Sequence, residues 1–284
     1  MADFSPALIV VLLLVLAAEF VNGWTDSPNA IATVVSTRVL SPAKAVLMAV
    51  GLNMIGVLIT GTAVATTIGK GIVKPEALDL SVVAAAMLTI VLWSTIAWRL
   101  GIPTSESHEL VAGLAGAGLA AAGPSVLLSA GWGKVLIGLV FSTFLGFGLA
   151  YLIMTSLYWL LKGFRVGSIR TVFSKLQVIS AGFMAFSHGS NDGQKFMGAF
   201  SLALVIGGVM EEFTIPVWVM LLCGAVMGLG TALGGWRIIR TMGFKITKLD
   251  QVNGFAAETA GSLSILLSWQ DYWTGLKIPL SYFL

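Results

Sequence analysis

A polar stretch, Asn-Gly-Trp-Thr-Asp-Ser-Pro-Asn-Ala (residues 22–30), interrupts an apolar segment near the N-terminus. A second polar stretch, His-Gly-Ser-Asn-Asp-Gly-Gln-Lys-Phe (residues 188–196), interrupts another apolar segment in the second half of the chain. The two stretches align without gaps at an offset of 166 residues, which pairs Asp26 with Asp192. Because backbone at membrane depth must be satisfied, a spanning helix breaks only where it lines a polar cavity. The two stretches therefore predict two discontinuous helices around one site.

The composition is that of a membrane protein. Apolar residues make up 57% of the 284 residues and charged residues 10%, with a mean hydropathy of +0.95. An average soluble domain has roughly 45–50% apolar and about 25% charged residues. This excludes a soluble enzyme, a disordered chain and a nucleic-acid-binding module. The single cysteine, Cys223, excludes an internal disulfide framework and a cysteine-rich zinc site.

A spanning helix needs about 20 mostly apolar residues, and eight segments qualify as candidate spans. They lie at about 5–37, 45–68, 81–98, 107–122, 132–160, 176–210, 216–236 and 251–269. Basic residues gather in alternate loops, which places those loops in the cytoplasm and the N-terminus outside. The two interrupted segments then cross the lipid bilayer in opposite directions, as expected of a multi-pass protein of the cytoplasmic membrane.

We therefore predict an all-α polytopic membrane protein, an inverted-repeat secondary transporter with discontinuous helices and about eight or more spans. The first repeat is expected at residues 1–125 and the second at 176–284. Residues 126–175 form a linking span and a basic cytoplasmic loop. In each broken helix, the exposed amides favour anions and the exposed carbonyls favour cations. Pro28 is suited to begin the second half of the first one.

Carboxylates and amides inside apolar segments are the candidate ligands of a coupling cation. An ionised carboxylate at membrane depth costs several kcal/mol, and hard cations take oxygen ligands. The alternative for the aspartates and asparagines is helix capping, and for Glu258 it is a hydrogen bond to a neighbouring helix. The predicted coupling-cation residues are Asn22, Asp26, Asn191, Asp192 and Glu258.

A third polar stretch, Gly-Ile-Pro-Thr-Ser-Glu-Ser-His (residues 101–108), starts a helix and could cradle an anion with hydroxyls and amides. Lys195 either contacts an anion or neutralises Asp192. His108 and His188 lack the ligand spacing of a zinc site, so no metal site is predicted. For His108 a packing or pH-sensitive role competes with a substrate contact.

Taken together, these stretches resemble the inorganic phosphate transporter (PiT) family, in its bacterial low-affinity phosphate permease branch. The family repeats a motif of the type Gly-Ala/Phe-Asn-Asp-x-x-Asn-Ala, once in each half. Residues 23–30 resemble the first copy, and residues 188–198 are close to the second copy of the bacterial branch. Residues 101–108 and 254–258 resemble two further family segments, so the resemblance runs from about residue 18 to about residue 268.

The resemblance implies cation-coupled symport of inorganic phosphate by alternating access. Sodium or protons would be the coupling cation, a divalent metal co-transported with phosphate is a further option, and no cofactor is needed. The anion is expected between the two broken helices. The substrate-binding candidates, to which the residue argument adds Thr104 and Lys195, are Asp26, Asn29, Thr104, Ser105, Ser107, Asn191, Asp192 and Lys195.

Other functions stay open at this point: a sulfate permease of the same family, a channel and an intramembrane enzyme. The sequence lacks a His-Glu-x-x-His helix, a Gly-x-Ser-x-Gly elbow and a phosphate-cradling Gly-x-x-x-x-Gly-Lys loop, which disfavours the enzyme. Two broken helices of opposite direction favour a carrier over a channel. Glycine-rich helix faces are compatible with a homodimer.

The sequence departs from the family pattern at three places. Thr25 stands where asparagine usually precedes the aspartate, and Glu106 stands inside the hydroxyl-rich segment. The second half should also end with its own Pro-x-Ser-Thr-Thr-His segment and another helix, yet the chain stops shortly after Ser281. A truncated, inactive member of the family is therefore a further alternative.

Overall fold

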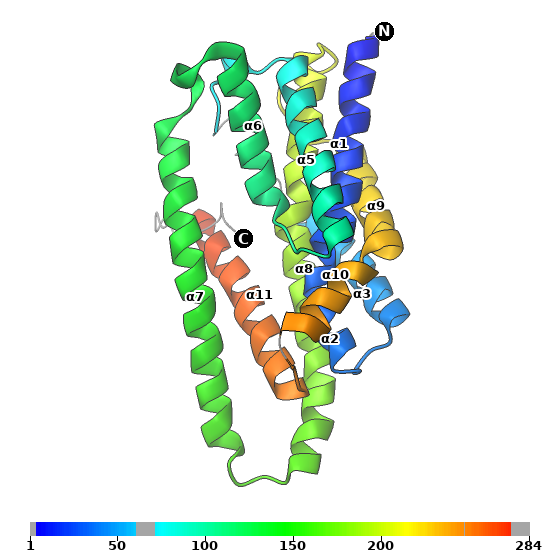
Figure 1. The fold of residues 1–284 in the computed structure, drawn as a ribbon, viewed down its shortest axis with the longest axis vertical. Helices are drawn as coiled ribbons and strands as arrows, with labels where there is room; N and C mark the ends of the chain where they lie inside the picture. The colour runs from blue at the N-terminus through cyan, green and yellow to red at the C-terminus, as the bar shows by residue number, and fades with distance from the viewer. Residues whose placement is uncertain (1–3, 61–71, 247, 274–284) are drawn as a thin grey trace.

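The structure is a computed structural model that describes residues 4–60, 72–246 and 248–273, and these are nearly all helical (Figure 1). The principal helices are α1 (Pro6–Thr25), α2 (Ala32–Ser36), α3 (Pro42–Ile59), α5 (Leu80–Leu100), α6 (Glu106–Ala122), α7 (Ser129–Leu161), α8 (Val166–Ile206), α9 (Val217–Gly234), α10 (Trp236–Thr241) and α11 (Gln251–Trp273). Short helical turns connect them: η1 (Ser27–Ala30), η2 (Pro75–Ala77), η3 (Pro124–Val126) and η4 (Met242–Ile246). The predicted all-α class is confirmed.

Five helical segments among the described residues are long and apolar enough to cross a membrane. They are Pro6–Ala30, α3, α5, Gly131–Leu161 and α9. Helices α6, α8 and α11 also stand where spans were predicted, but α6 has only 17 residues and α8 carries the second polar stretch. The chain is thus a multi-pass membrane protein. Residues 274–284, on which the predicted shortening of the second half rests, lie outside the described residues.

The first predicted break is confirmed. Helix α1 ends at Thr25, where the N–H of Asp26 donates to the carbonyl of Asn22. The turn η1 follows and contains Pro28, and α2 resumes the helical path at Ala32. Proline has no N–H and clashes with the preceding helical turn, so α1 cannot continue through this position. The break leaves the Asp26 side chain at the end of α1.

The second predicted break is wrong, because α8 runs as one helix of 41 residues through the whole polar stretch. That stretch contains no proline, and its backbone hydrogen bonds remain inside the helix. Its glycines serve another purpose, since both Gly189 and Gly193 pack closely against α3. Only the first stretch therefore offers freed backbone groups, and the second contributes its side chains from a continuous helix face.

Helices α1 and α8 run in opposite directions, as predicted, and pack on each other (Figure 1). Each also packs on a helix from the other half of the chain: α1 on α9, and α8 on α3. In addition, α1 packs on α5 and α8 packs on α11. Helices α1 and α8 therefore each contact one helix of their own half of the chain and one helix of the other half.

Glycines set the two crossings between the halves. A Cβ atom on Gly23 would lie 2.1 Å from the carbonyl oxygen of Met227 in α9, and one on Gly189 would lie 2.2 Å from the carbonyl oxygen of Asn53 in α3. Gly23 and Gly189 are the aligned glycines of the two polar stretches. The partner helices also have glycines at these crossings. In α9, Gly230 approaches the backbone carbonyl of Phe20, and in α3, Gly56 approaches that of Phe186.

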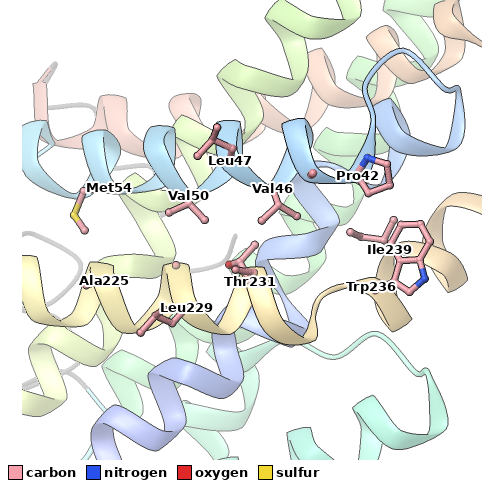
Figure 2. A pocket seen from close by; sticks show the side chains of 13 residues that line it. Pro42, Val46, Leu47, Val50, Met54, Ala225, Leu229, Thr231, Trp236 and Ile239 are labelled. Carbon is pink, nitrogen blue, oxygen red and sulfur yellow. The ribbon is translucent and has the colours of Figure 1, made fainter.

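Between α3 and α9 an apolar groove of about 870 Å³ remains (Figure 2). Its lining includes Val46 and Val50 from α3 and Leu229 from α9, with Trp236 at one end. Helix α9 packs on α1 and α3 packs on α8, so the groove lies between the two helices that flank α1 and α8. The halves thus meet backbone to backbone at the glycine crossings, whereas α3 and α9 meet through side chains that also line the groove.

Alanine at Gly189 should destabilise the protein, because its methyl group would collide with backbone that cannot swing away. Overpacking of this kind costs about 1–3 kcal/mol and sometimes more. We expect a lower Tm and less monodisperse protein for Gly189→Ala in detergent. Gly167→Ala is the matched control, since it lies in the same helix with nothing within 4 Å of the added Cβ. Equal Tm values for the two variants would contradict the role assigned to the crossing.

Candidate functional site

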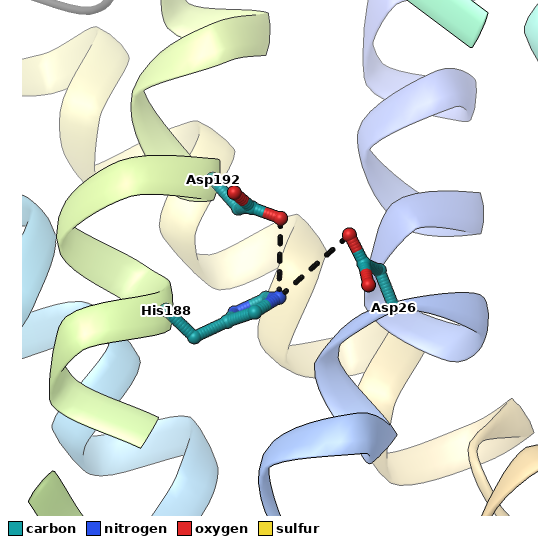
Figure 3. A group of neighbouring side chains, drawn as sticks. All are labelled: Asp26, His188 and Asp192. Carbon is teal, nitrogen blue, oxygen red and sulfur yellow. Dashed lines mark ion pairs between the residues drawn. The ribbon is translucent and has the colours of Figure 1, made fainter. Parts of the chain in front are cut away.

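The break after α1 and the middle of α8 bring three ionisable side chains together, Asp26, His188 and Asp192 (Figure 3). The Nε2 atom of His188 lies 3.3 Å from an Asp192 carboxylate oxygen and 4.0 Å from an Asp26 oxygen. One ligand atom from each residue lies within 4.8 Å of the others, and the side chains are nearly buried. Two carboxylates and an imidazole in this arrangement can hold a cation.

The same face of α8 supplies a buried ammonium group. Lys195, three residues after Asp192, forms an ion pair with it and also donates to the hydroxyl of Ser107 at the start of α6. The amide of Asn191 donates to Asp192 over 3.2 Å, and the amide of Asn29 donates to Asp26 over 2.9 Å. Donors and carboxylates from α1, η1, α6 and α8 thus form one connected site.

Glu106 adds a further buried carboxyl group. It is fully buried, and it accepts hydrogen bonds from the hydroxyls of Thr25 and, at 3.4 Å, Ser94. Glu106 and Asp192 are both electrostatic neighbours of Asp26, so these carboxylates would repel one another if all were ionised. Two departures from the family pattern, Thr25 and Glu106, are therefore hydrogen-bonded to each other. The site holds more carboxyl groups than cationic side chains.

A second set of oxygen atoms lies one helical turn before the break. Glu19 and Asn22 are both fully buried, and the amide of Asn22 donates to one carboxylate oxygen of Glu19 over 3.1 Å. Within the described part of the chain, the other carboxylate oxygen of Glu19 and the amide oxygen of Asn22 have no hydrogen-bond partner. Unpaired buried oxygens are costly, and a bound cation would satisfy them.

The structure does not bring Glu258 to this site. Glu258 lies on α11 and accepts hydrogen bonds from Thr33 in α2 and Ser180 in α8. Ser180 precedes His188 by two helical turns on α8, so Glu258 belongs to a separate buried cluster. The alternative reading of Glu258, a hydrogen bond to a neighbouring helix, describes these contacts as well.

The residues of the hydroxyl-rich stretch (101–108) differ in their positions relative to the central site. Thr104 and Ser105 precede α6, Ser107 reaches Lys195, and His108 is exposed. His188 was absent from the predicted site, as were Thr25 and Glu106. The signal for His188 was its position four residues before Asp192, which puts both on one face of a continuous helix. A break in this helix would separate the two side chains, so the spacing indicates a shared face only when the helix is continuous.

Removing one member of the buried Lys195–Asp192 pair should destabilise the protein more than removing both. Breaking a buried ion pair costs about 3–5 kcal/mol because a charge is left without its partner. We expect Lys195→Met to lower Tm strongly and Asp192→Asn/Lys195→Met to recover part of the loss. Lys175→Met, on the exposed face of α8, is the control. Additive losses in the double variant would show that the pair is not coupled.

Comparison with known proteins agrees with this architecture. The chain matches the phosphate transporter family (PHO4) over residues 22–282. It is 41% identical over 277 residues to a probable low-affinity inorganic phosphate transporter of Rhizobium meliloti (strain 1021), covering 97% of this chain and 81% of the relative. It is 38% identical over 260 residues to a protein of the same description from Bacillus subtilis (strain 168), covering 90% and 78%.

The fold is also similar to a solved structure described as the sodium-dependent phosphate transporter. The TM-score is 0.85 at 22% sequence identity, covering 98% of this chain and 87% of the other. The matching family is one of transporters and not of enzymes, which confirms the predicted class. By the extent of the family match and the identity to these relatives, the chain belongs to the phosphate transporter family.

Proposed function

We propose that the chain is a symporter that carries inorganic phosphate across the cytoplasmic membrane, coupled to Na⁺ or H⁺, by alternating access. The family match and the descriptions of the relatives support phosphate as the substrate. The observation that carries the coupling is the convergence of Asp26, His188 and Asp192 in a nearly buried site.

The charges of this site explain why an anion needs a cation with it. Two unit charges of like sign 4 Å apart repel by about 4 kcal/mol at the effective dielectric of a protein near its surface. A phosphate ion next to Asp26, Asp192 and Glu106 would meet such repulsion from several carboxylates. A cation or protons taken up first would cancel it, so the empty site disfavours phosphate and the cation-loaded site accepts it.

The side chains divide into two groups by their chemistry. Asp26 and Asp192, with His188 and Asn191, offer oxygens and an imidazole to the coupling cation. Lys195 and Ser107, with the amide of Asn29, are donors suited to phosphate, and Thr104 and Ser105 add hydroxyls at the start of α6. The set of two carboxylates and one imidazole also suits a divalent metal carried together with phosphate.

Two buried acidic sites lie outside this group. Glu19 and Asn22 present unpartnered oxygens among the described residues and are a candidate for a second coupling cation. Glu258 is proposed as a cation site of its own, since Thr33 and Ser180 surround its carboxylate with hydroxyls. Both sites hold carboxyl groups at membrane depth, where such groups are functional by default.

Alternating access is supported by the reciprocal packing of the halves. The glycine crossings, α1 on α9 and α8 on α3, are those that two inverted copies of one unit would make. We propose that the two repeats move relative to each other about these crossings, while the apolar groove between α3 and α9 changes its width. The polar site between α1 and α8 would then face each side of the membrane in turn.

The test is radiolabelled phosphate uptake into proteoliposomes that contain the purified chain. A sodium gradient, a proton gradient, added divalent metal and excess sulfate are applied in separate experiments. Uptake driven by one gradient and resistant to sulfate is expected. Block by sulfate would move the substrate to sulfate, and no uptake from folded protein under any gradient would contradict the proposal.

Asp26→Asn should abolish uptake or remove its dependence on the coupling cation, because one cation ligand loses its charge. Asp79→Asn is the control. Asp79 lies outside the membrane-spanning segments, where the Ser81 hydroxyl and the Val82 N–H hold the pKa of its carboxyl below the usual range. Asparagine also caps a helix as well as aspartate does, so Asp79→Asn should transport normally. Full, cation-dependent uptake by Asp26→Asn would remove Asp26 from the mechanism.

A further inference from the structure

A polar pocket of about 530 Å³ lies at the first turn of α8, far along that helix from the proposed transport site. Its lining comes from three separate regions. The end of α2 contributes Ser36, Thr37 and Arg38, the start of α8 contributes Val166, Ile169 and Arg170, and the start of α11 contributes Leu249, Asp250, Gln251 and Val252. The transport mechanism proposed above uses none of these side chains.

Two guanidinium groups dominate the charge of this pocket. Arg38 and Arg170 both line it, and among the described residues neither forms an ion pair. The one acidic residue in the lining, Asp250, is engaged locally, because its carboxylate accepts the N–H of Asn253 over 2.8 Å at the start of α11. The lining therefore carries one excess positive charge, and two arginine forks are available to an anion.

The helix ends reinforce this potential. Helix α8 begins at the pocket without a side-chain cap and without an acidic residue in its first turn. The positive end of a long helix, with its free N–H groups, favours an anion. Arginine is the residue best suited to planar, two-pronged contacts with phosphate oxygens. The charge and the donors suit a phosphate group, and the volume admits one.

A line of polar side chains connects this pocket with the interior. The amide of Gln251 donates to the carbonyl of Thr37, and the Thr37 hydroxyl donates to Gln177 over 2.9 Å. The amide of Gln177 in turn lies 3.5 Å from Glu258. The pocket is thus in contact with the buried Glu258 cluster, which is joined to α2 and to the middle of α8.

We propose that this pocket, formed by Arg38 and Arg170, is a second site for a phosphate group. It is separate from the Asp26–Asp192 site and lies on the face where the basic loops predict the cytoplasm. The phosphate group belongs either to free inorganic phosphate or to the headgroup of an anionic phospholipid. Both present the same tetrahedral oxyanion to the two arginines.

The test removes the two charges from the full-length chain without disturbing its backbone. Arg38 has a φ angle of 61°, in the left-handed region that favours glycine, so Arg38→Gly suits the local fold. Arg170 is exposed on α8 and is changed to Gln. Lys162→Gln/Arg240→Gln, two exposed basic residues outside the pocket, is the matched control with the same change in net charge.

Two measurements separate the sources of the phosphate group. In the first, equilibrium dialysis with ³²P-labelled inorganic phosphate, without any ion gradient, counts bound phosphate in detergent. In the second, native mass spectrometry counts phosphatidylglycerol retained by protein taken from phosphatidylglycerol-containing vesicles. We expect Arg38→Gly/Arg170→Gln to lose one equivalent, or at least tenfold in affinity, in one of the two measurements, and the control to lose neither.

A loss of bound inorganic phosphate identifies a free-anion site, and a loss of retained phosphatidylglycerol identifies a headgroup site. Unchanged binding in both measurements, or an equal loss in the control, overturns the proposal. The result does not depend on transport. Asp26→Asn, which is expected to abolish uptake, should retain this second equivalent, so failure of the transport proposal and failure of this one are distinguishable.

Discussion

Two aspartates held beside one histidine inside an apolar bundle are the constraint on which this architecture depends. Asp26 and Asp192 approach His188 from two helices, and neither carboxylate could ionise there without a compensating charge. Lys195 compensates only one of them. The remaining negative charge is offset by a proton, by the imidazolium form of His188 or by a bound cation. The coupling of a cation to phosphate proposed above rests on this charge count.

The close contacts between helices follow from the need to place these side chains. Asp26 reaches α8 because Pro28 ends α1 there, and Asp192 reaches α1 because α8 passes the same depth unbroken. Gly23 and Gly189 let each helix approach a carbonyl of the opposite half. Contacts of backbone with backbone tolerate no added methyl group, so these crossings fix the spacing of the helices at both points. In the proposed alternating access, the apolar groove between α3 and α9 is where the spacing of the helices would change.

Much of this fold could be predicted from the sequence, because length, apolar runs and proline act locally. The helices, the opposite directions of α1 and α8 and the break at residues 26–28 are confirmed. The second break was wrong because glycine alone does not distinguish a helix end from a close crossing. Thr25 and Glu106 were read as separate departures, since nothing in one sequence shows that residues 81 positions apart are hydrogen-bonded. Glu258 is predicted as a cation ligand together with Asp26 and Asp192, because the sequence does not show that it lies in a separate cluster.

Helix α8 contributes to three of the polar features described above. Its first turn lines the arginine pocket, Gln177 and Ser180 contact the Glu258 cluster, and residues 188–195 form half of the central site. Because the helix is unbroken, a displacement of its start is carried to its middle without a hinge to absorb it. The unbroken course of α8, which differs from the predicted break, therefore links its first turn to its middle. An anion bound at the proposed site on the first turn would therefore contact the same helix that carries His188 and Asp192.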